Sequence, residues 1–235
     1  SPDDAGADAA IADAGVPCPA IPPIVGGTPE TDALANAPAR CGAPSYAWLR
    51  DETLGDVLSR EVTGRYTAET LAGLAAAAGV TLPAPPEHDV RIETLVYRTQ
   101  DRGAPVQSTT LIAYPSDLEE RTEVPILLFL HGTSGFTRGC GPTGDPATAL
   151  LTGVLASYGW IAVAPDYLGL ESDGDDYPLI HPYLIGEAVA LPSLDAVRAA
   201  IEALSADAGA VCASPRVGVL GGSEGGHAAP WVGRL

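Results

Sequence analysis

The chain has 235 residues, of which 46% are hydrophobic, and its formal net charge is −18. This length allows one sizeable hydrophobic core, and the acidic balance argues against nucleic acid and anionic membranes as partners. All 12 basic residues are arginine, which excludes a phosphate-binding P-loop because that loop needs Gly-Lys-Ser/Thr, and no apolar run approaches the ~20 residues of a membrane span.

The first part of the chain divides into an arm and the start of a domain. Residues 1–44 are rich in Ala, Asp, Pro and Gly, which predicts a flexible arm, and residues 45–235 are expected to form the domain. Thr67 begins a capping pattern for a helix that ends at Gly79.

Two strands are predicted next, over residues 90–99 and 104–115, joined by a turn at Asp101-Arg102-Gly103. After Pro125 the pattern changes to short, continuously apolar runs, which are typical of strands buried in a parallel sheet. We expect such strands at 126–130, 161–164 and 216–220, and helices at 146–158 and 186–205, with Pro192 as a kink or restart. This alternation predicts an α/β fold with a mostly parallel sheet and flanking helices.

The third of these strands runs directly into Gly221-Gly222-Ser223-Glu224-Gly225, followed by a short helix. This G-x-S-x-G pattern in a strand-to-helix context predicts a nucleophile elbow with Ser223 at its apex. The turn is so sharp that side chains at the elbow glycines, Gly221 and Gly225, would collide. A glycine-rich nucleotide loop is the alternative, but G-x-G-x-x-G is not matched.

Four blocks in fixed order resemble the secretory lipase family of α/β-hydrolases. They are PILLFLHGTSGFTRGCGPT, VAPDYLGL, HPYLIGEAVALPSLDAVRAA and GGSEGGHAA, within about residues 90–235. The resemblance implies carboxylic-ester hydrolysis through Ser, His and an acid, with no metal or organic cofactor. The chain departs from many relatives at Gly222, where they have His, and at Glu224, where Gln is common.

The oxyanion hole of this fold takes one N–H group from the loop after the strand at 126–130 and one from the residue after the nucleophile. We therefore expect the backbone N–H groups of Thr133 and Glu224 to be the donors. His131, which begins the same loop, is expected to organise the loop and to line the site rather than to act as a base.

The acid and the base of the triad are expected to be missing. In this fold the triad runs Ser, then Asp or Glu, then His, and only twelve residues follow Ser223. We expect a further C-terminal segment, in cis or as a second chain, to supply both groups, and the isolated chain to be nearly inactive. His227 is expected to pack on its helix and line the site, and His227 and His181 are less favoured bases. Asp166, at the end of a strand, is expected to organise a loop near the site.

The favoured function is a serine esterase or lipase that acts on a small-molecule acyl ester through an acyl-enzyme on Ser223. A peptidase or a tannase-like esterase on the same fold is one alternative. A non-catalytic surface or binding protein that retains the elbow is another.

The four cysteines form no C-x-x-C pair, so zinc has no local support. Their even number favours disulfides in an oxidising compartment, hence a secreted or extracytoplasmic protein, with the N-terminal arm as a surface tether. Of the three possible connectivities we expect Cys140–Cys212 together with Cys18–Cys41.

Overall fold

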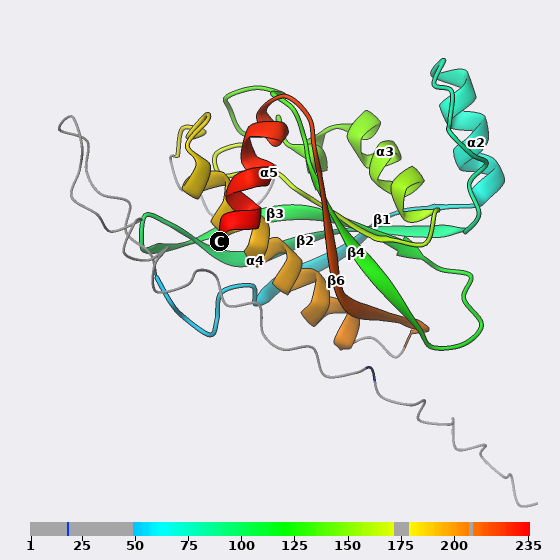
Figure 1. The fold of residues 1–235 in the computed structure, drawn as a ribbon, viewed down its shortest axis with the longest axis horizontal. Helices are drawn as coiled ribbons and strands as arrows, with labels where there is room; N and C mark the ends of the chain where they lie inside the picture. Colours follow the sequence, from blue (N-terminus) through cyan, green and yellow to red (C-terminus); the bar gives the residue numbers. More distant parts are fainter. Residues whose placement is uncertain (1–17, 19–48, 172–178, 207–208) are drawn as a thin grey trace, which may run out of the picture.

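The computed structural model describes residue 18 and residues 49–171, 179–206 and 209–235. The expected arm over residues 1–44 therefore lies outside the described residues, apart from Cys18. Within the described part a six-stranded sheet has the order β1-β2-β3-β5-β4-β6 (Figure 1). The strands are β1 (Val57–Tyr66), β2 (Val90–Asp101), β3 (Ala104–Pro115), β4 (Thr122–Leu130), β5 (Ile161–Pro165) and β6 (Val211–Gly221). The helices are α2 (Ala68–Ala77), α3 (Pro146–Ala156), α4 (Gly186–Ser205) and α5 (Glu224–Arg234), with a 3-10 turn, η1 (Pro142–Gly144).

The sheet is mixed. β1, β2 and β3 pair in antiparallel fashion, and β3 is antiparallel to β5. β4 lies between β5 and β6 and is parallel to both. The predicted α/β fold with flanking helices is confirmed, but the described sheet is mixed rather than mostly parallel, because β1, β2 and β3 join it as antiparallel strands. Since β4 and β6 run in the same direction, their carboxyl ends meet at one edge of the sheet.

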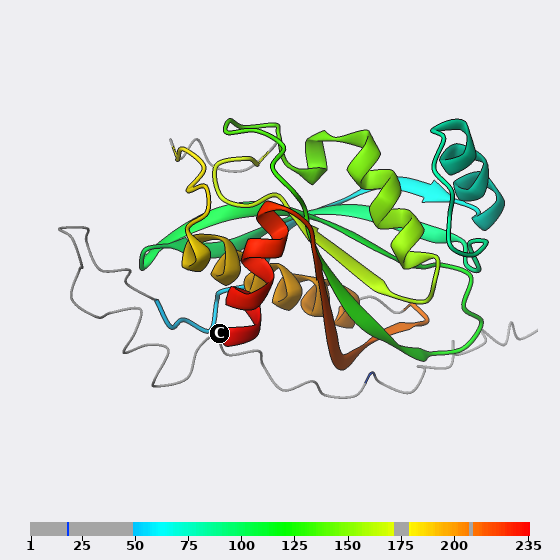
Figure 2. The same ribbon diagram turned by 45° about the horizontal axis from the view of Figure 1, so that its top comes forward.

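Helices cover both faces of the sheet, and each face has its own core (Figure 2). One core packs α4 and α5 against residues such as Ile126, Leu128 and Leu130 on alternate positions of β4. The other packs α2 and α3 against residues that include Ile92 and Ala162. Alternate positions of β4 are only partly buried, whereas every residue of β5 is buried, as expected for a central strand of a sheet that helices cover on both faces.

Several local predictions are confirmed. The Thr67 side chain accepts a hydrogen bond from the Thr70 N–H at 3.1 Å and so caps α2. Gly79, just after that helix, has a φ of +73°. Arg102 and Gly103 both have positive φ, at 48° and 79°, which makes the tight turn between β2 and β3.

Two element predictions need correction. Strand β1 was not predicted, because its sequence is largely polar and two register irregularities break the apolar alternation. Helix α4 does not restart at Pro192 but runs through it without a break. Pro192 is buried, and its carbonyl oxygen accepts a hydrogen bond from Tyr97 Oη at 2.9 Å, so packing against β2 outweighs the backbone hydrogen bond that proline removes.

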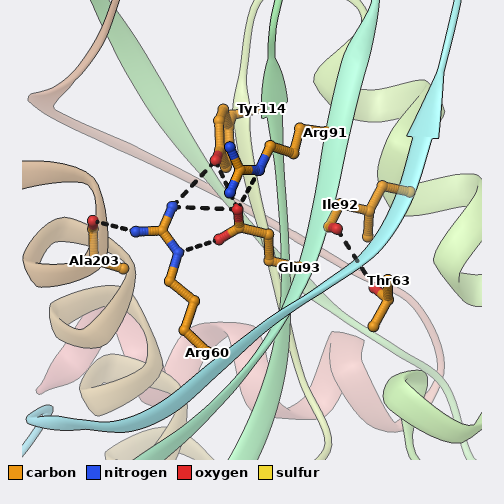
Figure 3. A network of polar contacts seen from close by, with 7 residues as sticks. All are labelled: Arg60, Thr63, Arg91, Ile92, Glu93, Tyr114 and Ala203. Carbon is orange, nitrogen blue, oxygen red and sulfur yellow. Dashed lines mark hydrogen bonds and ion pairs between the residues drawn. The ribbon is translucent and has the colours of Figure 1, made fainter. Parts of the chain in front are cut away.

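A buried carboxylate joins β1, β2, β3 and α4 at some distance in sequence from the elbow (Figure 3). Glu93 has no exposed side-chain area and forms ion pairs with Arg60 and Arg91. Tyr114 Oη donates to Glu93 Oε1 at 2.9 Å, and Arg60 Nη1 donates to the Ala203 carbonyl oxygen at 2.8 Å. Burial and the neighbouring Glu93 charge raise the pKa of Tyr114 to about 12. The cluster fastens the edge strand β1 and α4 to the sheet.

The disulfide prediction is wrong in its pairing. Cys18 is bonded to Cys212, with a Cα–Cα distance of 5.4 Å. Cys140 is a free thiol, and Cys41 lies outside the described residues. The reason is topological: Cys140 follows the carboxyl end of β4, whereas Cys212 lies at the amino end of β6, the opposite edge of the sheet.

Candidate active site

Ser223 lies between the end of β6 and the start of α5. Figure 1 shows these two element ends next to each other, at the top of both elements. The backbone of Ser223 has φ 53° and ψ −117°, a conformation that L-residues rarely adopt. Ser223 is exposed, whereas Glu224 beside it is a buried residue. The backbone therefore holds Ser223 at the apex of a strained turn with its hydroxyl open to solvent.

The two elbow glycines occupy positions that no side chain fits. A Cβ atom at Gly221 would lie 2.3 Å from the Gly225 carbonyl oxygen. A Cβ atom at Gly225 would lie 1.9 Å from the Leu130 carbonyl oxygen, at the end of β4. In contrast, Gly222 has open space around it, so that position accepts a larger residue without a clash.

The loop after β4 approaches the elbow. A Cβ atom at Gly132 would lie 3.5 Å from Ser223 Cβ and 3.5 Å from the Gly222 carbonyl oxygen. Thr133 follows and is exposed, with its hydroxyl 3.2 Å from Tyr183 Oη. The structure thus brings the Gly132–Thr133 segment beside Ser223. Tyr183 was not singled out from the sequence, although it lies in the HPYL block.

The side chain of Glu224 turns away from solvent and meets His181. Glu224 Oε1 lies 2.7 Å from His181 Nε2, and the two side chains are 1% and 0% exposed. His181 Nδ1 lies 2.9 Å from the Leu168 carbonyl oxygen. Both ring nitrogens of His181 are therefore engaged inside the protein, which leaves neither free to take a proton from Ser223 in this arrangement.

His131 is buried beneath the loop that it begins. Its ring stacks on Tyr167 with ring centroids 4.0 Å apart, and its Nδ1 lies 2.7 Å from the Gly132 carbonyl oxygen. Tyr167 Oη donates to the His131 carbonyl oxygen at 3.0 Å. Burial lowers the pKa of His131, which favours the neutral form of the ring.

Asp166 ties the same loop to the sheet. Its carboxylate is buried and accepts hydrogen bonds from the hydroxyls of Thr109 and Thr143, and from the Thr143 N–H at 2.8 Å. Gly141 lies so close that a Cβ atom there would be 2.5 Å from the carboxylate. Burial raises the pKa of Asp166 to about 7, against the opposing effect of the three hydrogen bonds.

His227 lies one turn into α5, where its backbone N–H donates to the Ser223 carbonyl oxygen at 3.1 Å. Its Nδ1 is buried and has no hydrogen-bond partner among the described residues. The described residues contain no group of three or more His, Cys, Asp or Glu side chains that could hold a metal ion. They also contain no helix with the length and apolar character that crossing a bilayer requires.

This arrangement, with a strained serine at a strand-to-helix turn and a loop from the neighbouring parallel strand beside it, can be compared with known proteins. Residues 146–235 match the secretory lipase family. The match confirms the resemblance read from the sequence blocks, and it includes Asp166, His181 and Ser223. None of the curated proteins compared with the chain matches it.

Two solved structures are similar over most of the chain. The rice cell wall degrading esterase LipA from Xanthomonas oryzae is 27% identical, with a TM-score of 0.62 over 77% of this chain and 45% of that protein. A protein of Legionella pneumophila described as a candidate hydrolase is 26% identical, with a TM-score of 0.62 over 75% of this chain and 46% of that protein. The chain thus spans less than half the length of either protein.

Proposed function

We propose that the protein is a serine carboxylic-ester hydrolase in which Ser223 attacks the ester carbonyl and forms an acyl-enzyme. The observation that carries the proposal is the backbone of Ser223, which is held at φ 53° between Gly221 and Gly225, two positions that exclude side chains. A protein keeps such a conformation only where the surrounding structure enforces it, and this one presents a hydroxyl at the end of a helix dipole.

The oxyanion that forms in the attack needs two hydrogen-bond donors. We assign the backbone N–H groups of Thr133 and Glu224 to this role. Glu224 is the first residue of α5, and the first N–H groups of a helix have no partner within the helix. Thr133 follows Gly132, which lies in contact range of Ser223. LipA, a protein of similar structure, is a cell wall degrading esterase, which supports the same reaction class.

The general base is proposed to come from outside the described residues. His181 has both ring nitrogens engaged. His131 is stacked on Tyr167, and burial lowers the pKa of its ring, which makes it a weaker base. We infer that the acid and the base lie on a further segment, in cis or on a second chain, as the greater length of LipA suggests. On this proposal residues 1–235 alone hydrolyse esters very slowly, because a serine without a base is a weak nucleophile.

The open edge of β6 supports the same proposal. Among the described residues β6 pairs only with β4, and Val217, Val219 and Leu220 are each at least 40% exposed. An unpaired, apolar strand edge is a ready template for another segment. The proposed location is extracytoplasmic, since the Cys18–Cys212 disulfide needs an oxidising compartment, and tethering through residues 1–44 stays a prediction.

The test is reaction of Ser223 with a fluorophosphonate probe, together with turnover of p-nitrophenyl esters of graded acyl length in the full-length protein. We expect labelling and ester turnover that Ser223→Ala abolishes. Ser116→Ala is the control, because Ser116 is an exposed serine that follows β3 and belongs neither to the elbow nor to the oxyanion loop. Peptide amides used in the same assay separate an esterase from a peptidase. Unlabelled Ser223 and no turnover of either substrate class would instead favour a binding protein.

A further inference from the structure

We propose that His181 is a positioning residue for the oxyanion hole, which acts through the side chain of Glu224. The inference rests on the proposed function, because Glu224 supplies one of the two proposed donors through its backbone N–H. His181 belongs to the segment before α4 and reaches across to the first residue of α5.

Glu224 has its backbone at the exposed turn and its side chain in the protein interior. Its backbone follows Ser223 directly, at the exposed turn, while its carboxyl group lies in the interior at 2.7 Å from His181 Nε2. Glu224 Oε2 is buried and has no hydrogen-bond partner among the described residues. The contact with His181 is therefore the hydrogen bond that fixes this carboxyl group, and through it the orientation of the first turn of α5.

His181 is itself held rigidly on the other side. Its Nδ1 lies 2.9 Å from the Leu168 carbonyl oxygen, and its ring lies nearly parallel to that of Tyr167, at 11° with centroids 6.0 Å apart. Gly169 packs against its backbone so closely that a Cβ atom there would lie 2.6 Å from His181 N. The loop after β5 thus fixes the position of His181, and His181 in turn fixes the position of the Glu224 carboxyl group.

The hydrogen bonds also fix the number of protons in the pair. A carbonyl oxygen only accepts, so His181 Nδ1 must carry a hydrogen that it donates to Leu168. The contact between Nε2 and Oε1 then needs one further proton, either on the ring or on the carboxyl group. Both forms are neutral as a pair and both keep the hydrogen bond, so the link exists in the dry interior without an unpaired charge.

The number of protons shared by His181 and Glu224 also explains why glutamine is a conservative replacement for Glu224. A glutamine amide N–H donates to Nε2 of a neutral His181 ring whose Nδ1 keeps its hydrogen. A leucine at the same position fills similar space but has nothing to donate. Glu224→Gln therefore preserves the link, and Glu224→Leu breaks it.

Loss of the link should appear in kcat rather than in KM. The donor acts on the charge that develops in the transition state, and a displacement of about 1 Å in a catalytic group costs about 10²-fold in rate. Substrate binding in the ground state depends on it much less. A role limited to filling space would instead lower stability and leave kcat unchanged in the folded fraction.

The experiment measures kcat and KM for a short-chain p-nitrophenyl ester, and the unfolding temperature, in the full-length protein. His181→Phe should lower kcat about 10²-fold with KM nearly constant. Glu224→Gln should retain far more kcat than Glu224→Leu. His181→Phe leaves the buried Glu224 carboxyl group without a partner, and the double variant His181→Phe/Glu224→Leu removes that group. The double variant should therefore be more stable than His181→Phe, but its kcat should stay low. His88→Phe, at a surface histidine paired with Asp117, is the control that leaves kcat unchanged.

Wild-type kcat in His181→Phe, or in the double variant, would overturn the proposal. If His181→Phe does not fold, the double variant decides alone by its kcat. Ser223→Ala distinguishes failure of the positioning role from failure of the proposed function. If Ser223→Ala abolishes turnover while the His181 variants keep it, only the positioning role of His181 is wrong. If Ser223→Ala leaves turnover intact, both the proposed function and the positioning role are wrong.

Discussion

Gly225 lies directly against the carbonyl oxygen of Leu130, so close that a Cβ atom at Gly225 would be 1.9 Å from it. The first turn of α5 therefore touches the end of β4, the strand from which the His131–Thr133 loop departs. This contact sets the distance between the elbow and the loop that supplies the second proposed oxyanion donor.

Gly225→Ala should consequently harm both stability and turnover. The added methyl group meets backbone rather than a flexible side chain, so the elbow and β4 must separate, at a cost of about 1–3 kcal/mol. Gly73→Ala is the matched control: Gly73 lies in α2 with no heavy atom within 4 Å of an added Cβ, and alanine there should stabilise by about 0.5–1 kcal/mol. Urea unfolding measures both changes, and equal effects would contradict the elbow geometry.

Glu93→Gln should destabilise the fold, because it leaves Arg60 and Arg91 without their shared carboxylate. We expect a loss of about 2–3 kcal/mol, below the ~3–5 kcal/mol of a fully buried pair because both arginine side chains keep about a quarter of their area exposed. Glu61→Gln, at an exposed position of β1, should change the free energy of unfolding by less than about 0.5 kcal/mol. An equal response of the two variants would show that the cluster contributes nothing.

Cys18→Ser should lower stability by about 2–5 kcal/mol, because the bond closes a loop of 194 residues in the unfolded chain. Cys140→Ser should have little effect in comparison, since Cys140 is a free thiol. Peptide mapping without reduction checks the pairing directly. Recovery of a peptide that links Cys140 to Cys212 would show that the pairing described above is wrong.

Asp166→Asn should change how stability depends on pH. The unfolded carboxyl group ionises near its ordinary pKa of 3.8, whereas in the folded protein it ionises near 7. Between these values the native state binds more protons, so this group makes the free energy of unfolding fall as pH rises from about 4 to about 7. Asparagine keeps partners for both threonines and does not titrate.

Urea unfolding of wild type and Asp166→Asn at several pH values tests this. Asp195, whose pKa burial raises to about 6, contributes a slope of the same sign to both proteins, so the difference between the two profiles isolates Asp166. Parallel profiles between pH 4 and 7 would show that the Asp166 carboxyl group titrates at its ordinary pKa.

The features that the sequence predicted correctly depend on local pattern. The helix cap at Thr67 and the turn at Arg102-Gly103 each need only a few neighbouring residues. The strand that leads to Ser223 is a run of apolar residues that ends in glycine, so its place could be predicted, although β6 begins five residues earlier than expected, at Val211.

The features that the sequence did not reveal depend on residues far apart in the chain. The His181–Glu224 hydrogen bond spans 43 residues and the Cys18–Cys212 bond spans 194. The sequence around one partner of such a pair does not indicate which distant residue is the other partner. The polar strand β1 was missed for a related reason, since it is fixed by Arg60 reaching Glu93 and not by an apolar alternation.

The central place of β4 between β5 and β6 has a consequence for the order of folding. Antiparallel neighbours such as β2 and β3 meet through a tight turn, but Leu130 and Gly221 become neighbours only when β6 joins β4, about ninety residues further along the chain. Closing such long loops is slow, and contacts of high sequence separation form late. The elbow and the oxyanion loop are therefore assembled by one of the last pairings of the sheet, and a partly folded molecule has a serine at residue 223 but no site around it.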